Sequence, residues 1–300
     1  MTTSGGEHAE RFIHLRPLLF TIVYEILGSA TESDDVLQDS YLRWADVDLA
    51  TVRDTKSYLA QLVTSQALNT LRARARRRED YVGPWLPEPL LLDEGDASTD
   101  VVLAESVSMA MLVLLETLTP DERAVFVLRE VFGFDYDDIA GAVGKSVATV
   151  RQMAHRSREH VHARRNRFGP VDAKRTTQIT EQFLTAAATG DMDGLMALLA
   201  PGATWTADHG GKASALPRPL VGARKVAGVM LAFFRASQRM DIRFDTAIYN
   251  SAPAVVIYDS DKLEGVLVFE VIDGVITNLY AMRNPDKLGG VTIPRVIARS

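Results

Sequence analysis

Cysteine does not occur among the 300 residues. Its absence excludes disulfide frameworks, zinc fingers, iron–sulfur clusters and thiol nucleophiles, so a metal site would need His and carboxylate ligands alone. The sequence also lacks any apolar run near the roughly 20 residues that cross a bilayer, and its polar N-terminus lacks the pattern of a secretory signal. We therefore expect a cytoplasmic protein without membrane contact, and predict neither a cofactor nor a metal site.

The rest of the composition is that of a globular protein, with 47% apolar and 24% charged residues. A chain of this length has room for two or three domains. Its formal net charge of −6 argues at first against a nucleic-acid partner. The distribution of charge along the chain, however, favours a nucleic-acid partner.

Basic residues are concentrated in two segments that flank an acidic one. Residues 86–138 contain 13 acidic side chains against two arginines, a net of −11, whereas residues 145–167 contain seven basic side chains against one acid, a net of +6. A second basic run, with five arginines, lies within residues 72–78. Two such stripes are suited to contact a polyanion at two places, although a single basic run is usually only a solvated helix face.

Periodicity divides the chain into three units and a connector. Apolar residues at helical spacing predict an all-α unit at 1–80 and another at 106–168, while prolines, glycines and acids predict a linker at 81–105. Residues 172–300 predict an α+β unit with a curved antiparallel sheet. Its clearest signal is Asp273-Gly274 between two alternating runs, because a two-residue hairpin turn requires φ > 0.

The most specific motif is a helix-turn-helix between Tyr136 and Arg158. Gly144 is suited to end the first helix in the left-handed conformation, and Ser146 to cap the second. The second helix then presents a basic outer face, which favours reading of the DNA major groove over an ordinary helical hairpin. The residues predicted to contact bases are Arg151, Gln152, His155 and Arg156, and those predicted to contact phosphates are Ser146 and Thr149.

These residues resemble a known family. Tyr136–Arg158 is similar to the promoter-reading region 4 of extracytoplasmic-function sigma factors, and Leu118–Leu128 is similar to the helix that precedes it. Asp34–Trp44 resembles the region 2 helix that docks on core RNA polymerase, and Ser57–Arg78 the helix and basic tail that hold the −10 element. The resemblance implies a promoter-directing sigma factor whose partners are core polymerase and promoter DNA at its −10 and −35 elements.

The resemblance also implies particular contact residues. Those expected to bind core polymerase are Asp35, Leu37, Gln38, Asp39 and Tyr41. Those expected to bind the −10 strand are Asn69, Arg72, Arg76 and Arg77, since a melted strand is held by cations and stacking surfaces.

Three further segments resemble sigma factors that carry a SnoaL-like extension: Trp85–Pro89, Asp208–Lys212 and Asn284–Leu288. In the second segment His209 and Lys212 stand where the family pattern has glycine and arginine. The resemblance implies a cone fold at 172–300 and regulation in cis through contacts with the linker. The residues expected to make these contacts are Trp85, Leu86, Pro87, Asp208, Asn284, Pro285, Asp286 and Lys287.

Cone folds of this type also house polyketide cyclases and ketosteroid isomerases, which place an Asp base in an apolar pocket. Asp208 and several strand tyrosines supply suitable residue types, but fold does not determine function, so we predict no catalytic residues and no enzyme. A small-molecule ligand of the cone is a further hypothesis. Two alternatives remain open: a stand-alone regulator that senses a ligand, and a cone-fold enzyme fused to a DNA-binding module.

Overall fold

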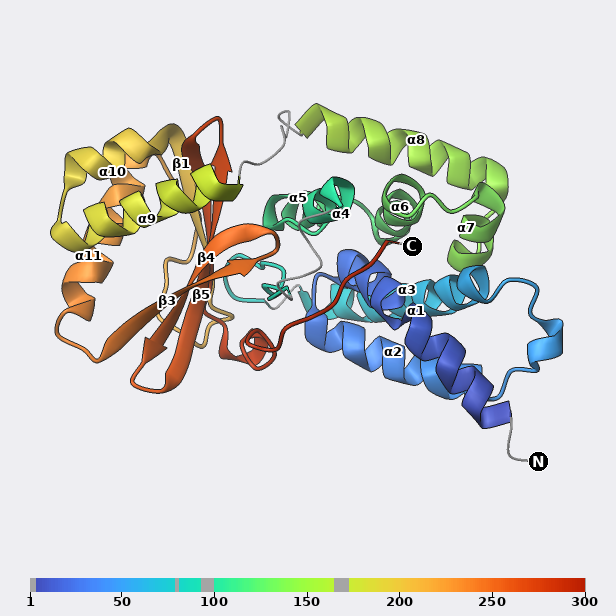
Figure 1. Ribbon diagram of the computed structural model, residues 1–300. Coiled ribbons are helices and arrows are strands. Elements are labelled where there is room, and N and C mark those ends of the chain that lie inside the picture. Colours follow the sequence, from blue (N-terminus) through green and yellow to red (C-terminus); the bar gives the residue numbers. More distant parts are fainter. Residues whose placement is uncertain (1–3, 79–80, 93–99, 165–172, 300) are drawn as a thin grey trace.

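The protein consists of two helical units packed side by side and a sheet unit at the opposite end (Figure 1). The structure is a computed structural model that describes residues 4–78, 81–92, 100–164 and 173–299. The final residues of the chain, dark red in Figure 1, cross from the sheet unit back onto the helical units. An extended linker, residues 81–92, runs between the same units.

The N-terminal helical unit is formed by three long helices. Gly28 takes the left-handed conformation after α1, with φ of 66°, and the Ser29 side chain accepts a hydrogen bond from Glu32 N to cap α2. Trp44 is fully buried and its indole donates to the carbonyl of His8, which ties α2 to α1. The elements are α1 (Ser4–Leu27), α2 (Ala30–Ala45), η1 (Leu49–Thr51) and α3 (Thr55–Arg78).

The second helical unit contains the predicted helix-turn-helix. Gly144 ends α7 in the left-handed conformation, and Ser146 Oγ accepts a hydrogen bond from Thr149 N at the start of α8, which confirms both sequence predictions. Thr119 and Glu122 form a capping box that begins α6. The elements are α4 (Val101–Ser106), α5 (Met109–Leu115), α6 (Pro120–Phe126), the π-helical turn η2 (Val127–Val131), α7 (Tyr136–Val143) and α8 (Val147–Arg164).

The C-terminal sheet unit packs three helices against a six-stranded sheet of order β2-β1-β6-β5-β4-β3. Its elements are α9 (Ala173–Thr189), α10 (Met192–Leu198), β1 (Leu199–Asp208), β2 (Leu220–Val221), α11 (Ala223–Ser237), β3 (Ile242–Tyr249), β4 (Ala252–Asp259), β5 (Lys262–Ile272), β6 (Val275–Met282) and η3 (Pro285–Lys287). The predicted α+β class is confirmed. The predicted hairpin is confirmed too, since Asp273 and Gly274 both have positive φ between β5 and β6.

The expectation of a purely antiparallel sheet was wrong, because β1 pairs with β6 in parallel. Alternation of polar and apolar residues reveals which face of a strand is buried, but not which strand lies beside it. The β1–β6 pairing joins segments about 75 residues apart and carries no local turn signal of the kind that fixes a hairpin.

Apolar packing joins the units. One core cluster runs through both helical units and also includes Ile297 near the C-terminus. A second fills the space between α9–α11 and one face of the sheet, where the rings of Phe183 and Phe269 meet edge to face. A third lies on the other face and brings together strand residues, Leu86 of the linker and Met109 of α5. The sheet unit is therefore attached to the rest of the chain through a buried apolar contact.

A single turn of the sheet unit reaches the junction of all three units. Asn250, fully buried with φ of 51°, lies in the turn between β3 and β4. Its side-chain carbonyl accepts a hydrogen bond from Leu90 N at 2.8 Å, and its amide donates to the hydroxyl of Tyr24 in α1 at 2.7 Å and to the carbonyl of Val107 at 2.8 Å. This one side chain thus contacts the linker and both helical units.

Asn250→Ala should destabilise the folded protein by about 3 kcal/mol, because it removes three buried hydrogen bonds. Urea unfolding followed by fluorescence and circular dichroism would measure the change. The control is Ser251→Ala at the next position of the same turn, where the buried hydroxyl has no hydrogen-bond partner among the described residues. Equal destabilisation by both substitutions would contradict the role given to Asn250.

Candidate functional site

The outer face of α8 carries the residues predicted to read bases. Arg151, Gln152, His155 and Arg156 are all exposed, whereas Val150, Met153 and Ala154 are buried against the unit. In this arrangement Arg156 pairs with Glu122 at 3.2 Å, and the guanidinium of Arg151 lies over the ring of Tyr136. The predicted phosphate contacts, Ser146 and Thr149, are exposed at the helix start and hydrogen-bond each other.

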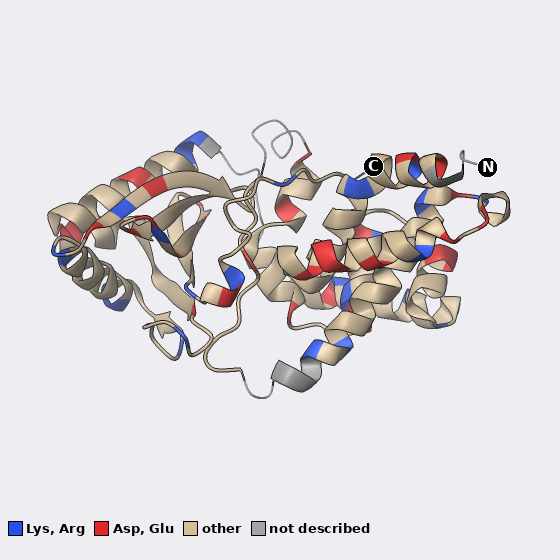
Figure 2. Ribbon diagram, turned by 90° about the horizontal axis from the view of Figure 1, so that it is seen from below, with Lys and Arg blue, Asp and Glu red and all other residues tan. Residues whose placement is uncertain are grey.

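The C-terminal part of α3 carries the residues predicted to hold the −10 strand, and Figure 2 shows Lys and Arg positions gathered there. Asn69 and Arg72 are exposed. The side chains of Arg76 and Arg77 lie outside the described residues. Arg74 points inward instead, with its side chain only 11% exposed, where it pairs with Glu32 and stacks on Trp85. Arg74 was not among the residues expected to hold the −10 strand.

Two acidic residues of α6 form ion pairs with basic residues of both predicted DNA-binding surfaces. The Asp121 carboxylate pairs with Arg72 of α3 at 2.7 Å and with Lys145 of the helix-turn-helix turn at 3.2 Å. Its neighbour Glu122 holds Arg156. These two acids take the positions that phosphates would take around the same cations. Asp121 was not singled out from the sequence, where it belongs to a general acidic segment.

The first helix of the helix-turn-helix packs directly on α3. Ser57 Oγ donates to Asp138 of α7 at 3.0 Å, and Gln61 Nε2 donates to the same carboxylate at 3.4 Å. Gly141 allows this approach, since a Cβ there would lie 3.1 Å from the Gln61 side chain. The two predicted DNA-reading helices, α3 and α8, are consequently held on one compact body.

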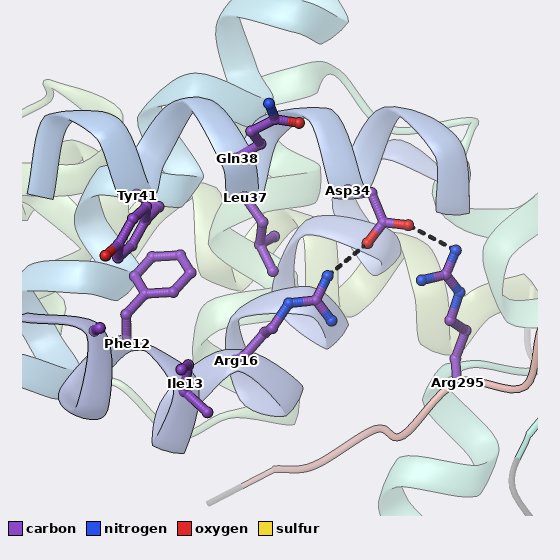
Figure 3. Close-up of a pocket in the computed structure, with 9 residues that line it drawn as sticks. Phe12, Ile13, Arg16, Asp34, Leu37, Gln38, Tyr41 and Arg295 are labelled. Atoms are coloured by element: carbon purple, nitrogen blue, oxygen red, sulfur yellow. Dashed lines mark hydrogen bonds and ion pairs between the residues drawn. The ribbon is translucent and has the colours of Figure 1, made fainter.

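The residues predicted to bind core polymerase lie along α2, which Figure 2 shows as a largely acidic helix. Asp35, Gln38 and Asp39 are exposed, and Tyr41 is half-buried with its ring against Phe12. Leu37 is only 2% exposed, so it belongs mainly to the core of the unit rather than to its surface. It still lines a cavity of about 450 Å³ between α1 and α2 (Figure 3).

Two of the residues predicted to join the linker to the sheet unit, Leu86 and Lys287, meet at the carboxylate of Asp208, which is fully buried at the end of β1. Tyr81 donates its hydroxyl to this carboxylate, and Leu86 N and Lys287 Nζ donate to it at 2.8 and 2.7 Å. Asn284 Nδ2 donates in turn to the Tyr81 hydroxyl at 2.9 Å. The linker is thus held by a buried ion pair and its hydrogen bonds.

Lys287 continues this contact toward the helical units. Its Nζ lies 3.9 Å from the centre of the Trp85 ring. The guanidinium of Arg74 in α3 lies over the same ring, 4.6 Å from its centre. Burial lowers the pKa of Lys287 to about 8, an effect that the adjacent Asp208 opposes. Leu86 and Pro87 are buried beside Trp85, and Pro285 begins the η3 turn that carries Lys287. Asp286 is more exposed and pairs with Lys212.

The departures from the family pattern have structural consequences. His209 is 6% exposed, and its Nδ1 accepts a hydrogen bond from Gly211 N at 3.0 Å. Its Nε2 packs on Gly83 of the linker, where an added Cβ would lie 2.5 Å away. Gly83 also has φ of 88°, so glycine is required at this position. Because histidine is larger than the glycine of the family pattern, position 83 of the linker, which contacts it, has no room for a side chain.

The linker contacts the N-terminal helical unit through Glu88. Its carboxylate accepts hydrogen bonds from Ser29 Oγ at 2.8 Å and Thr31 N at 3.1 Å, where α2 begins. Its backbone N donates to the Gly28 carbonyl at 2.8 Å. A carboxylate at a helix N-terminus is stabilised by the helix dipole and the free N–H groups. Glu88 thus fixes the linker against the start of the predicted polymerase-binding helix.

Glu25 is a fully buried acid between the two helical units. Its Oε1 accepts a hydrogen bond from Ser106 of α4 at 2.6 Å, and its Oε2 has no hydrogen-bond partner among the described residues. The Arg123 Nε donates to the Glu25 backbone carbonyl at 2.9 Å. Burial raises the pKa of Glu25 to about 8, and the hydrogen bond from Ser106 and the charge of Arg123 oppose this shift.

The described part of the chain contains neither a cluster of metal ligands nor a membrane-spanning helix. Within residues 4–78, 81–92, 100–164 and 173–299, no three His or acidic side chains are placed to bind a metal ion. Over the same residues, no helix is both long and apolar enough to span a membrane.

Comparison with known proteins assigns each unit to a family model. Residues 12–77 match Sigma-70 region 2, residues 108–161 match Sigma-70, region 4, and residues 180–279 match the SnoaL-like domain. The ECF RNA polymerase sigma factor SigJ of Mycobacterium tuberculosis is 32% identical over 290 residues, which cover 93% of this chain and 92% of that protein. The probable ECF RNA polymerase sigma factor SigI of the same species is 26% identical over 275 residues, covering 91% and 92%.

A solved structure is similar along nearly the whole chain. The crystal structure of Mycobacterium tuberculosis SigJ superposes with a TM-score of 0.74 at 29% identity, covering 94% of this chain and 98% of that one. The likeness therefore includes the linker and the sheet unit as well as the helical units.

Raising the pH from about 5 to about 8 should lower the thermal unfolding midpoint through Glu25. The folded state holds this proton more tightly than the unfolded state, so its stabilisation is full below the unfolded pKa and is lost as pH rises through about 8. Glu25→Gln, which resembles the neutral acid, should flatten that dependence in calorimetric scans. Glu10→Gln, an exposed position on the same helix, is the control and should leave the slope unchanged.

Proposed function

Because the chain belongs to the extracytoplasmic-function (ECF) family of RNA polymerase sigma factors, we propose that its SnoaL-like sheet unit regulates promoter use in cis. As a sigma factor, the protein acts with core RNA polymerase at promoter DNA. The sheet unit holds the region 2 and region 4 units in a closed arrangement that must open for initiation. The observation that carries this proposal is the linker, which is bound by all three units at once.

Each end of the linker contact opposes separation of the units. Tyr81 and Leu86 are bound to Asp208 of the sheet unit, while Glu88 caps α2 in region 2. Asn250 connects the sheet unit to Val107, at the start of region 4. Movement of region 4 away from region 2 therefore requires that the linker or the Asn250 turn be released.

The spacing of promoter elements supports a closed state that is inactive. The −10 and −35 elements are named for positions about 25 base pairs apart, or about 85 Å of B-form DNA at about 3.4 Å per base pair. Here α3 and α7 are in direct contact through Ser57 and Asp138, so one body carries both reading surfaces. The closed form cannot reach both elements of one promoter together.

Charge supports the same proposal. Arg72 and Lys145 are neutralised by Asp121, and Arg156 by Glu122, so cations assigned to DNA are engaged within the protein. In the open form we assign base contacts to Arg151, Gln152, His155 and Arg156, and the −10 strand to Asn69, Arg72, Arg76 and Arg77. Core polymerase docks on the face of α2 that carries Asp35, Gln38 and Asp39.

The described residues offer no observation that favours the two alternatives raised from the sequence. The candidate base of a cone enzyme, Asp208, is engaged by the linker and by Lys287 rather than directed into the apolar space beneath α9–α11. We therefore assign Asp208 a regulatory role.

Asp208→Asn should weaken the hold on the linker and shift the protein toward the open form, because buried Lys287 loses its counter-ion. Cysteines introduced at Ser65 and Glu159, the only thiols in the chain, would carry a fluorophore pair that reports the separation of α3 and α8. We expect lower energy transfer and higher transcript yield with core polymerase. Asp261→Asn, an exposed turn position in the same unit, should match the parent. Unchanged energy transfer in Asp208→Asn would overturn the closed-state role.

Arg156→Ala should reduce discrimination at one −35 base pair by about 1–3 kcal/mol, since a bidentate base contact has that value. Competition transcription with a panel of promoter variants would measure it. Arg156→Lys keeps the charge but loses the fork, so it should also lose discrimination while retaining the salt dependence of binding. Equal selectivity in all three proteins would remove Arg156 from the assigned base contacts.

A further inference from the structure

The groove between α1 and α2 has one end closed by a residue from the far end of the chain. Its walls include Phe12, Ile13, Leu37 and Tyr41, and Ile13 is 67% exposed (Figure 3). At the end of the groove, Figure 3 shows Asp34 of α2 between two arginines. One of them, Arg295, comes from the segment after the sheet unit.

Asp34 lies on the face of α2 assigned to core polymerase. It precedes Leu37 and Gln38 by three and four residues, a spacing that places side chains on the same side of a helix. The helix carries Glu32, Asp34, Asp35 and Asp39 against a single Arg43, so its net charge is −3. An acidic face beside an apolar groove is complementary to a partner that presents a cation next to an apolar side chain.

Both oxygens of the Asp34 carboxylate are already paired. Arg16 Nη2 lies 3.0 Å from Oδ1, and Arg295 Nη2 lies 2.6 Å from Oδ2. The guanidinium of Arg295 also lies over the ring of Phe20. A cation from a docking protein can pair with this carboxylate only if one arginine leaves.

Arg295 is the arginine that can leave while the helices of the unit stay in place, since it lies outside them. Arg16 belongs to α1, whereas residues 289–299, here called the tail, form turns followed by a segment outside any long helix or strand. The tail is attached by hydrogen bonds from Arg295 N to the Leu91 carbonyl at 2.9 Å and from Ala298 N to Thr21 Oγ1 at 3.1 Å. Buried Ile297 and an ion pair of Arg299 with Asp100 at 2.8 Å complete the attachment.

The contact is also incompletely satisfied. Arg295 Nε is buried and has no hydrogen-bond partner among the described residues. A buried donor left unpaired costs free energy, so this part of the contact opposes the favourable ion pair with Asp34. Such a balance suits a contact that a partner must displace.

We propose that the tail is a built-in competitor of core polymerase: Arg295 occupies Asp34 at the edge of the docking surface, and a basic element of core polymerase displaces it. This inference rests on the proposed function, because it takes α2 as the docking helix. It adds a second level of control, over polymerase binding itself, to the control of DNA contacts by the linker.

The position of the tail couples the two levels. The tail follows η3 directly, and Lys287 of η3 holds both Asp208 and the Leu86 carbonyl. Arg295 N in turn is bonded to Leu91 of the linker. Displacement of the tail by core polymerase therefore removes one support of the linker, and by linkage the open form binds core polymerase more tightly.

Two full-length variants test the competition by different routes. Arg295→Ala removes the competing cation, and Ala298→Pro keeps that cation but removes the backbone donor that fixes the tail to Thr21. Equilibrium titration of labelled protein with purified core polymerase should show binding about fivefold tighter, or more, for both variants. Arg243→Ala, on an exposed ion pair of β3, is the control and should bind as the parent does.

The outcomes separate this inference from the function on which it rests. If the parent, the Arg243→Ala control and both tail variants all fail to bind core polymerase, the proposed function is wrong. If the parent binds and neither Arg295→Ala nor Ala298→Pro binds more tightly, the competitor role is wrong. Weaker binding by Arg295→Ala would likewise overturn it, since Arg295 would then belong to the docking surface. Should Arg295→Ala fold poorly in circular dichroism, Ala298→Pro decides alone.

Discussion

A carboxylate removed from water must find donors within the protein, and the structure depends on how Asp208 meets this requirement. Its donors come from Tyr81 and Leu86 of the linker and from Lys287 beyond β6, over sequence separations of 127, 122 and 79 residues. Satisfying one buried charge therefore fixes the linker on the sheet unit. Trp85 is consequently placed between Lys287 and Arg74, and Glu88 at the start of α2. A change at this carboxylate reaches region 2 through two residues of the linker.

The acidic residues of the chain also form ion pairs that join its units. The net charge of the chain is −6, and on the proposed assignment its DNA-binding cations are clustered, with the acids between the clusters as their counter-ions. Asp121 is shared by Arg72 and Lys145, which lie on different units. Two distant basic stripes are thus drawn together by one carboxylate. On the proposed function, phosphates compete for these pairs, so that DNA favours separation of the units.

Local signals made the fold largely predictable, and contacts between distant residues set the limit. Gly144, Ser146 and the Asp273-Gly274 turn act on their immediate neighbours, so their roles follow from sequence alone. Leu86 and Lys287 beside Asp208 were named through family resemblance, but Tyr81 was missed and the pairing of these residues was not predicted. Asn250 and Arg295 were missed because their partners Tyr24 and Asp34 lie 226 and 261 residues away. Leu37 was expected at an interface and lies mainly in the core, since an apolar residue on a helix does not reveal which surface covers it. The parallel pairing of β1 with β6 was missed for the same reason.

Regions 2 and 4 share an apolar cluster, which the proposed opening reaction exposes to water, so the free energy of opening depends on temperature. Exposure of apolar surface to water raises the heat capacity, so the free energy of opening is a curved function of temperature. The closed form is then most stable at one temperature, and it opens more readily above and below that temperature. Core polymerase that covers the exposed surface removes this curvature. On the proposed function, opening of the free sigma factor therefore depends on temperature more strongly than the behaviour of its complex with polymerase does.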